Sequence, residues 1–130
     1  MAGNNLEELE KIYKSFKEKV SLDWDAVERH NFRLAEFLNV QGDVWKHYSG
    51  WAGVYYLYSD DGFVHYVGEG TTLEWGVGYR VRENATKGGL IQQPAMNVGC
   101  IFFGKSDLPF ALALERFLII GLCPPCNKLA

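Results

Sequence analysis

Two short motifs of glycine and tyrosine constrain the fold of this chain more than any other feature. Residues 53–55 read Gly-Val-Tyr, residues 66–68 read Tyr-Val-Gly, and Asp-Asp-Gly lies between them at residues 60–62. The flanking residues are mostly aromatic or β-branched, which favours strands, and Asp-Gly favours a tight turn with a positive φ angle. We therefore expect an antiparallel hairpin with strands over residues 52–59 and 63–68.

The turn decides which side chains face each other across this hairpin. With a two-residue turn at Asp61 and Gly62, Tyr55 opposes Gly68 and has Tyr66 as a diagonal neighbour. The two phenols then lie on one face of the sheet, about 7–8 Å apart. A three-residue loop would reverse this parity, because side chains alternate between the two faces of a strand.

Length, charge and cysteine content exclude several classes of protein. The 130 residues suit one domain with a modest core, and no apolar run reaches the ~18 residues of a membrane span. No apolar signal region precedes Glu7 and Glu8, so we expect a cytoplasmic protein without membrane contact. Three cysteines do not make a disulfide framework, which agrees with a reducing compartment. A net charge of −3 gives no general attraction to nucleic acid, so any polyanion must be bound locally.

Helices are predicted before and after the hairpin. Apolar residues recur at helical spacing over residues 6–20, and Asn5 with Glu8 forms a capping box. Three further elements are expected, a second helix, a third strand and a last helix, over residues 23–38, 98–103 and 110–122. The glycine-rich segment over residues 69–93 is expected to be loop and short helix.

The last predicted helix carries an isolated carboxylate. Glu115 and Arg116 are its only charges, and a helix that is apolar nearly all round is mostly buried. A carboxylate on such a helix is paired, protonated or bound to a metal ion. Glu115 is therefore either half of a structural ion pair with Arg80, Arg82 or Arg116, or a functional group.

In this order and spacing the motifs resemble the GIY-YIG endonuclease superfamily. The similarity rests on the two tripeptides, an arginine on the following helix, Leu114-Glu115 followed by Leu118-Ile119, and Asn127 twelve residues after the glutamate. It covers residues 51–128. The resemblance implies a small α+β nuclease domain, residues 51–130, built on a three-stranded antiparallel sheet flanked by helices. Residues 1–50 have no counterpart in the family and are expected to form a helical extension of two short helices and a linker.

The resemblance also implies hydrolysis of phosphodiester bonds with one divalent metal ion, Mg²⁺ or Mn²⁺. The family's catalytic roles fall on Tyr55, Tyr66, Arg80, Glu115 and Asn127. Glu115 is the implied metal ligand, and a lone carboxylate leaves most of the shell to water and phosphate oxygens. The arginine meets developing negative charge, the asparagine orders the site, and a tyrosine takes the proton of the attacking water. We expect Tyr55 to act as that base, with Tyr66 assisting.

Three positions depart from the family's pattern. The arginine stands further from the second motif than usual, so Arg82 competes with Arg80. Asn84 occupies a position where histidine or tyrosine is frequent, and Glu69 follows the second motif where lysine is frequent. A carboxylate at position 69 repels a phosphate unless it joins the metal shell. The candidates for substrate contacts are Glu69, Trp75, Arg82, Asn84 and Lys87.

These observations predict an endonuclease that acts on DNA, with RNA as the alternative substrate. Cutting both strands of a duplex takes two active sites, which favours a homodimer. The main rival is a weakened member of the same fold that binds nucleic acid or protein without cleaving it. A redox or zinc site at Cys123 and Cys126 is a more distant interpretation, because this pair follows a helix, where it serves as a helix stop that positions Asn127.

Overall fold

The structure is a computed structural model that describes residues 3–39, 41, 44–71, 75–86 and 96–127 of the chain. Its centre is one antiparallel sheet with the strand order β1-β4-β2-β3. The strands are β1 (Glu28–Arg33), β2 (Gly53–Tyr58), β3 (Val64–Gly70) and β4 (Asn97–Phe102). The predicted α+β class is confirmed, whereas the prediction of three strands is wrong by one.

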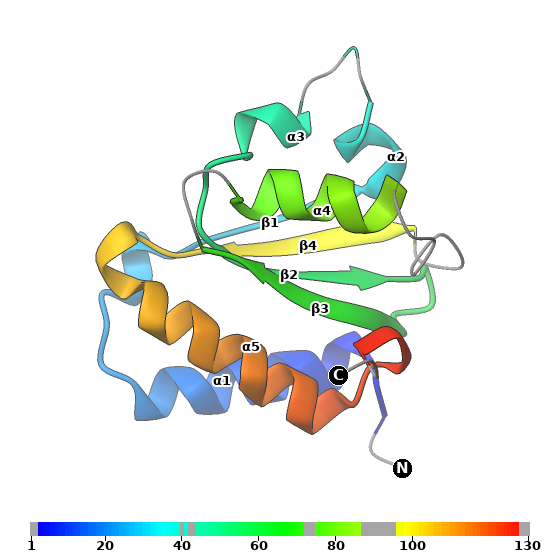
Figure 1. Cartoon of the computed structure of the whole chain (residues 1–130). Helices are drawn as coiled ribbons and strands as arrows, with labels where there is room; N and C mark the ends of the chain where they lie inside the picture. Colours follow the sequence, from blue (N-terminus) through cyan, green and yellow to red (C-terminus); the bar gives the residue numbers. More distant parts are fainter. Residues whose placement is uncertain (1–2, 40, 42–43, 72–74, 87–95, 128–130) are drawn as a thin grey trace.

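Helices cover both faces of this sheet (Figure 1). The α-helices in the described part of the chain are α1 (Leu6–Lys19), α2 (Leu34–Phe37), α3 (Val44–His47), α4 (Val77–Thr86) and α5 (Leu108–Leu122). One face of the sheet packs on α1 and α5, and the other packs on α2, α3 and α4. None of the described helices is long and apolar enough to cross a membrane.

The helix predicted over residues 23–38 is wrong, because the middle of this segment forms a strand. It contains a 3₁₀ turn (Trp24–Ala26), then β1 and the short α2. All six residues of β1 pair with β4. This pairing provides hydrogen-bond partners for the backbone groups along one edge of β4. A helix over the same residues would leave those groups without partners, so tertiary hydrogen bonding outweighs the weak helical pattern. The sequence signal for the strand is the alternation of polar and ring-bearing residues around His30 and Phe32.

Arg29 on β1 ties the first helix to the sheet. Its guanidinium donates two hydrogen bonds to the carboxylate of Glu10 on α1, at 2.7 and 2.6 Å, and one to the hydroxyl of Tyr56 on β2, at 2.9 Å. The same group lies 4.7 Å from the ring centroid of Tyr13. The amino end of α1 is capped as predicted, since the Asn5 side chain accepts a hydrogen bond from the Glu8 N–H.

Side chains from the first 50 residues take part in both halves of the core. Leu9 and Phe16 of α1 pack in one cluster with Val54 and Leu118, and Phe37 packs in the other cluster. The N-terminal residues therefore add a strand and core side chains rather than two helices and a linker alone. The assignment of residues 51–130 to a nuclease domain stays a prediction.

The hairpin loop spans residues 60–62, one residue more than predicted. The Ser59 N–H donates a hydrogen bond to the carbonyl oxygen of Phe63 at 3.0 Å, and Gly62 adopts a φ of 89°. A loop of this length on its own would place the two phenols on opposite faces of the sheet.

A bulge in β3 restores the predicted pairing. The register shifts by one residue beside Leu57, which faces Tyr66, so His65 is the extra residue on β3. Beyond the shift Tyr55 opposes Gly68, as predicted. The two phenols consequently share the face of the sheet that α4 covers.

Candidate active site

Glycine at position 68 lets the ring of Tyr55 lie across the neighbouring strand. A Cβ atom added to Gly68 would lie 2.5 Å from the Tyr55 hydroxyl oxygen, well inside van der Waals contact. Tyr55 is completely buried, and its ring centroid lies 6.0 Å from that of Tyr66 with an interplanar angle of 38°. The two motifs therefore bring a pair of phenols together.

Asn84 on α4 bridges these two phenols. Its side-chain amide donates a hydrogen bond to the Tyr55 hydroxyl and a longer one, of 3.5 Å, to the Tyr66 hydroxyl. Asn84 comes one helical turn after Arg80, so both side chains project from the same face of α4. The amide cannot accept a proton as a histidine would, but it holds both hydroxyl groups in place.

Burial raises the pKa of both phenols, but Tyr55 is fully buried whereas Tyr66 is only partly buried. For Tyr55 the loss of solvation comes first among the causes, and its pKa lies well above the usual range. Burial also raises the pKa of Tyr66, but a hydrogen bond with Tyr55 and the positive charge of Arg80 oppose that rise. Tyr66 is only partly buried. It is therefore the phenol that solvent can reach and that more readily becomes a phenolate.

Arg80 projects from α4 into a cleft at the end of β3. The cleft has a volume of about 310 Å³ and is lined by Glu69, Thr71, Trp75 and Arg80. The guanidinium makes no ion pair within the part of the chain that the structure describes. Its charge acts on both phenols and on Glu115.

The competing arginine points elsewhere. The Arg82 guanidinium carbon lies 4.8 Å from the ring centroid of Trp45 on α3, and one of its nitrogens lies 3.4 Å from a carboxylate oxygen of Glu83. Two residues along a helix turn the side chain by about 200°, which takes it away from the face that carries Arg80. Geometry thus places Arg80, not Arg82, beside the phenols.

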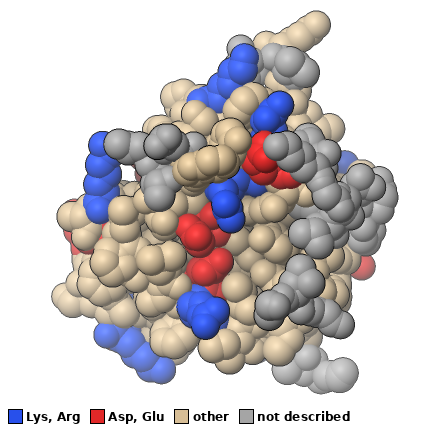
Figure 2. All heavy atoms as spheres, viewed as in Figure 1, with Lys and Arg blue, Asp and Glu red and all other residues tan. Residues whose placement is uncertain are grey.

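Glu115 on α5 belongs to the same electrostatic cluster. Its pKa is raised, first by burial and then by the negative charge of Glu69, while Arg116 and Arg80 oppose the rise. Glu115 has no ion pair among the described residues, so the structural ion pair considered from sequence is not observed there. Figure 2 shows acidic atoms between basic atoms in the middle of one face of the molecule.

The two carboxylates make a donor set that fits a hard divalent cation. Mg²⁺ and Mn²⁺ prefer oxygen ligands, and Mg²⁺ keeps several of its waters. The negative charge of Glu69 raises the pKa of Glu115, and a cation bound by both carboxylates would offset that repulsion. Thr71 donates a hydrogen bond of 3.0 Å to one oxygen of Glu69 and so orients it. No group of three or more His, Cys, Asp or Glu side chains occurs in the described ranges, so water and phosphate oxygens would have to complete the shell of any ion bound there.

Asn127 fixes the outer strand of the sheet next to Tyr66. Its side chain accepts a hydrogen bond from the Val67 N–H and donates one to the Val67 carbonyl oxygen, both at 2.8 Å. β3 is an edge strand, so these backbone groups have no strand partner. The chain reaches this position because α5 ends at Leu122 and Cys123 turns it with a φ of 48°. The role of Asn127 in ordering a catalytic site stays a prediction.

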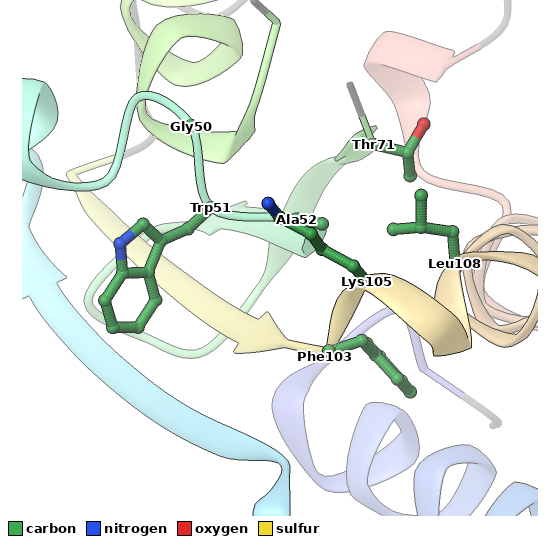
Figure 3. A pocket seen from close by; sticks show the side chains of 8 residues that line it. Gly50, Trp51, Ala52, Thr71, Phe103, Lys105 and Leu108 are labelled. Atoms are coloured by element: carbon green, nitrogen blue, oxygen red, sulfur yellow. The ribbon is translucent and has the colours of Figure 1, made fainter. Parts of the chain in front are cut away.

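A second pocket, also of about 310 Å³, adjoins the cleft and shares Thr71 with it. In Figure 3 the Lys105 side chain reaches back over Ala52, while Thr71 and Leu108 lie on the far side and the Trp51 indole points away. Lys105 makes no ion pair with any described residue. A polyanion that extends from the cleft along the surface would therefore meet a second cation.

The remaining sequence candidates have mixed outcomes. Trp75 lines the cleft, is 46 % exposed, and packs edge-on against Tyr79 with ring centroids 4.5 Å apart. Lys87 lies outside the described residues. Cys123 is exposed and Cys126 is partly buried, and neither belongs to a group of three or more metal-binding side chains among the described residues. No such described group therefore supports the zinc interpretation, and the redox interpretation stays untested.

Sequence reasoning missed Thr71 and Lys105. Thr71 follows Glu69 by two residues in an extended segment, so its side chain projects to the same side, and this spacing is the signal that could have found it. Lys105 has no such signal. Its place depends on the chain returning from β4 beside the start of β2, where the Phe103 N–H donates a hydrogen bond to the Ala52 carbonyl oxygen at 2.9 Å.

Comparisons with protein-family models, with curated proteins and with solved structures find no match to this chain.

Proposed function

We propose that this protein is a metal-dependent endonuclease of the GIY-YIG type that hydrolyses phosphodiester bonds in DNA. One observation carries the proposal: the phenols bridged by Asn84 lie in one electrostatically coupled cluster with Arg80, Glu69 and Glu115. Core packing does not require two carboxylates that repel each other beside an arginine that forms no ion pair with any described residue. A phosphate group and a divalent cation would complement these charges.

Arg80 is the phosphate-binding group in this proposal. Its planar guanidinium can donate two parallel hydrogen bonds to phosphate oxygens, and it stays positively charged throughout the reaction. It also stabilises the negative charge that develops on those oxygens in the transition state. The cleft that it lines also includes Trp75, whose side chain is 46 % exposed and would be the group to stack on a base.

Tyr66 is the proposed proton acceptor, with Tyr55 and Asn84 as the groups that position its hydroxyl. The attacking water transfers its proton to the phenolate oxygen of Tyr66 as its own oxygen approaches phosphorus. The hydrogen bond with Tyr55 and the charge of Arg80 favour that phenolate. This assignment reverses the sequence-based preference for Tyr55, because complete burial keeps Tyr55 away from water and raises its pKa strongly.

Glu115 and Glu69 are the groups that would hold the Mg²⁺ or Mn²⁺ ion. When bound, the ion supplies positive charge that stabilises the phosphate oxygens and the leaving group. Thr71 donates a hydrogen bond to Glu69, and Glu115 is partly buried on α5. DNA in the cytoplasm is the proposed substrate, with RNA as the alternative polymer that presents the same phosphate chemistry.

A weakened member of the same fold that binds without cutting is the second candidate. Two observations favour it: the raised pKa of Tyr66, which limits the phenolate fraction near pH 7, and the amide of Asn84 where a base is frequent in the family. Such a protein would bind nucleic acid through Arg80 and Lys105 but leave it intact.

Cleavage of supercoiled plasmid by the pure protein separates the two candidates. We expect nicked or linear product with Mg²⁺ or Mn²⁺ and none with a chelator, and we expect Glu115→Gln to be inactive in the same preparation. A gel-shift titration of the same DNA serves as the parallel measurement. Binding without cleavage at any metal concentration would contradict the endonuclease and support the binding protein.

A further inference from the structure

The outer surface of the α1–α5 pair carries an apolar groove with exposed side chains. Phe117 and Ile120 on α5 are 49 % and 71 % exposed, the latter being the most exposed large apolar residue among those described. The groove has a volume of about 390 Å³, and both helices contribute to its walls. α1 and α5 run antiparallel in contact, since the Phe16 and Phe117 rings lie 5.5 Å apart and Gly121 faces Ile12. None of these residues belongs to the candidate active site.

The α1 wall of the groove has an ordered distribution of charge. From the amino to the carboxyl end of α1, the residues of this wall are Glu8, Lys11, Ile12, Ser15, Phe16 and Lys19. The first turn of α1 also carries Glu7 and the last turn carries Lys17. The first turn of the helix thus carries acidic residues and its last turn carries lysines, while Lys11 adds one positive charge beside the apolar centre at Ile12 and Phe16.

We propose that this groove is the interface of a twofold symmetric dimer with a second copy of this chain. A twofold axis near the middle of α1 places the two α1 helices antiparallel, so the acidic end of each faces the basic end of the other. Glu8 of one copy then pairs with Lys19 of the second copy, and the reverse pair forms on the other side of the axis. Ile120 of each copy packs into the groove of the other, which removes its exposed surface from water.

The charge order favours a second copy over other occupants. An anionic membrane would attract the lysines but repel the acidic end of the same wall. An unrelated protein would have to carry the reverse charge order at the same helical spacing, which a second copy does by symmetry. Both the apolar centre and the charged ends therefore find a complement in the same partner.

Sedimentation velocity of the full chain over a concentration series tests this interface. We expect a dimer at about 100 µM that dissociates on dilution, as suits an interface of modest size. Ile120→Asp should shift the protein to monomer over the whole series. The matched control is Leu112→Asp, because Leu112 lies on the same helix with 43 % exposure but does not line the groove. Circular dichroism checks that both variants keep the fold.

Charge reversal distinguishes the second copy from the other occupants. Glu8→Lys and Lys19→Glu should each raise the dimer dissociation constant about tenfold or more, and the double variant should restore it to near the value of the original chain. Both Glu8→Lys and the double variant place a lysine in the first turn of α1, where its charge opposes the helix dipole. This cost is the same in both variants, so tighter association of the double variant reports the pairing between copies. A monomeric original chain, or a double variant no better than the singles, overturns the proposal. Co-sedimentation of that monomer with anionic vesicles would assign the groove to a membrane instead.

Discussion

Gly68 lies directly beneath the ring of Tyr55, and the absence of a side chain on one strand makes room for the phenol on the next. A Cβ atom at position 68 would lie 2.5 Å from both the Cζ and the hydroxyl oxygen of Tyr55. The glycine of the second motif and the tyrosine of the first are therefore one structural unit. A tyrosine held in this way cannot shift without disturbing Asn84, its hydrogen-bond donor.

Gly68→Ala tests this relationship. The added methyl group must displace a buried ring, so we expect a loss of about 1–3 kcal/mol in the free energy of unfolding. Urea unfolding measures it. Gly104→Ala is the control, because a Cβ atom at position 104 meets only the Asp107 carboxylate, at 3.8 Å, and should change stability little. Equal stability of the two variants would show that the ring of Tyr55 moves freely.

Glu115→Gln tests the assignment of the metal ligand in two ways. Cleavage should fall to background, because the amide keeps the shape of the side chain and loses its charge. Stability at pH 7 should stay the same or rise. The folded-state pKa of Glu115 is raised, so the folded state gains stability at pH values below the unfolded pKa and loses it as pH rises through the folded pKa. At neutral pH the charged carboxylate is therefore a cost that glutamine removes, and a lower melting temperature for the variant would indicate a structural ion pair instead.

Tyr66→Phe and Tyr55→Phe separate the two phenols. Removal of the Tyr66 hydroxyl should lower the cleavage rate about 100-fold or more, a typical contribution of a general base. Tyr55→Phe should cost less, because its hydroxyl only positions Tyr66 and counters part of the rise in the Tyr66 pKa. The rate of Tyr55→Phe should consequently reach its maximum at a higher pH than that of the original chain. A larger loss for Tyr55→Phe would return the role of base to Tyr55.

The two arginines should respond differently to truncation. Arg80→Ala removes the guanidinium that lies beside the phenols, so we expect a loss of about 100-fold or more in the rate of cleavage at saturating DNA. Arg82→Ala leaves the cleft intact and should mainly weaken DNA binding, with a less steep dependence on salt. Single-turnover rates and gel-shift titrations at two salt concentrations make the comparison. The opposite order would place the active arginine at position 82.

The hairpin could be predicted from sequence because its information is local. Turn residues and the alternation of side chains predict which residues pair. The prediction missed both the longer loop and the bulge at His65, but each shifts the register by one residue and the two shifts cancel. β1 could not be predicted as a strand, because its hydrogen bonds go to β4, some 70 residues away in sequence, and its own pattern is short. The candidate site likewise divides into residues that local motifs identify and contacts that depend on tertiary packing. Tyr55, Tyr66 and Glu115 stand in recognisable motifs, whereas the contact of Asn84 with both phenols and the closeness of Glu69 to Glu115 depend on how α4 and α5 pack on the sheet.

Glu69 is the residue for which sequence and structure lead to different expectations. From sequence its charge should repel a phosphate, in which case Glu69→Lys tightens DNA binding and raises activity. In the structure Glu69 lies close enough to Glu115 to raise the pKa of that carboxyl, and Thr71 orients it toward the cleft.

We therefore expect Glu69→Gln to weaken Mn²⁺ binding about tenfold or more, measured by titration of the free protein with detection of unbound Mn²⁺ by electron paramagnetic resonance. Glu69→Lys should abolish binding of the ion, because its ammonium group takes the place of the cation beside Glu115. Thr71→Val is the matched control, since it removes the orienting hydrogen bond, keeps both carboxylates and should weaken binding less than Glu69→Gln. Unchanged Mn²⁺ affinity in Glu69→Gln, together with tighter DNA binding in Glu69→Lys, would restore the interpretation of Glu69 as a group that only repels substrate.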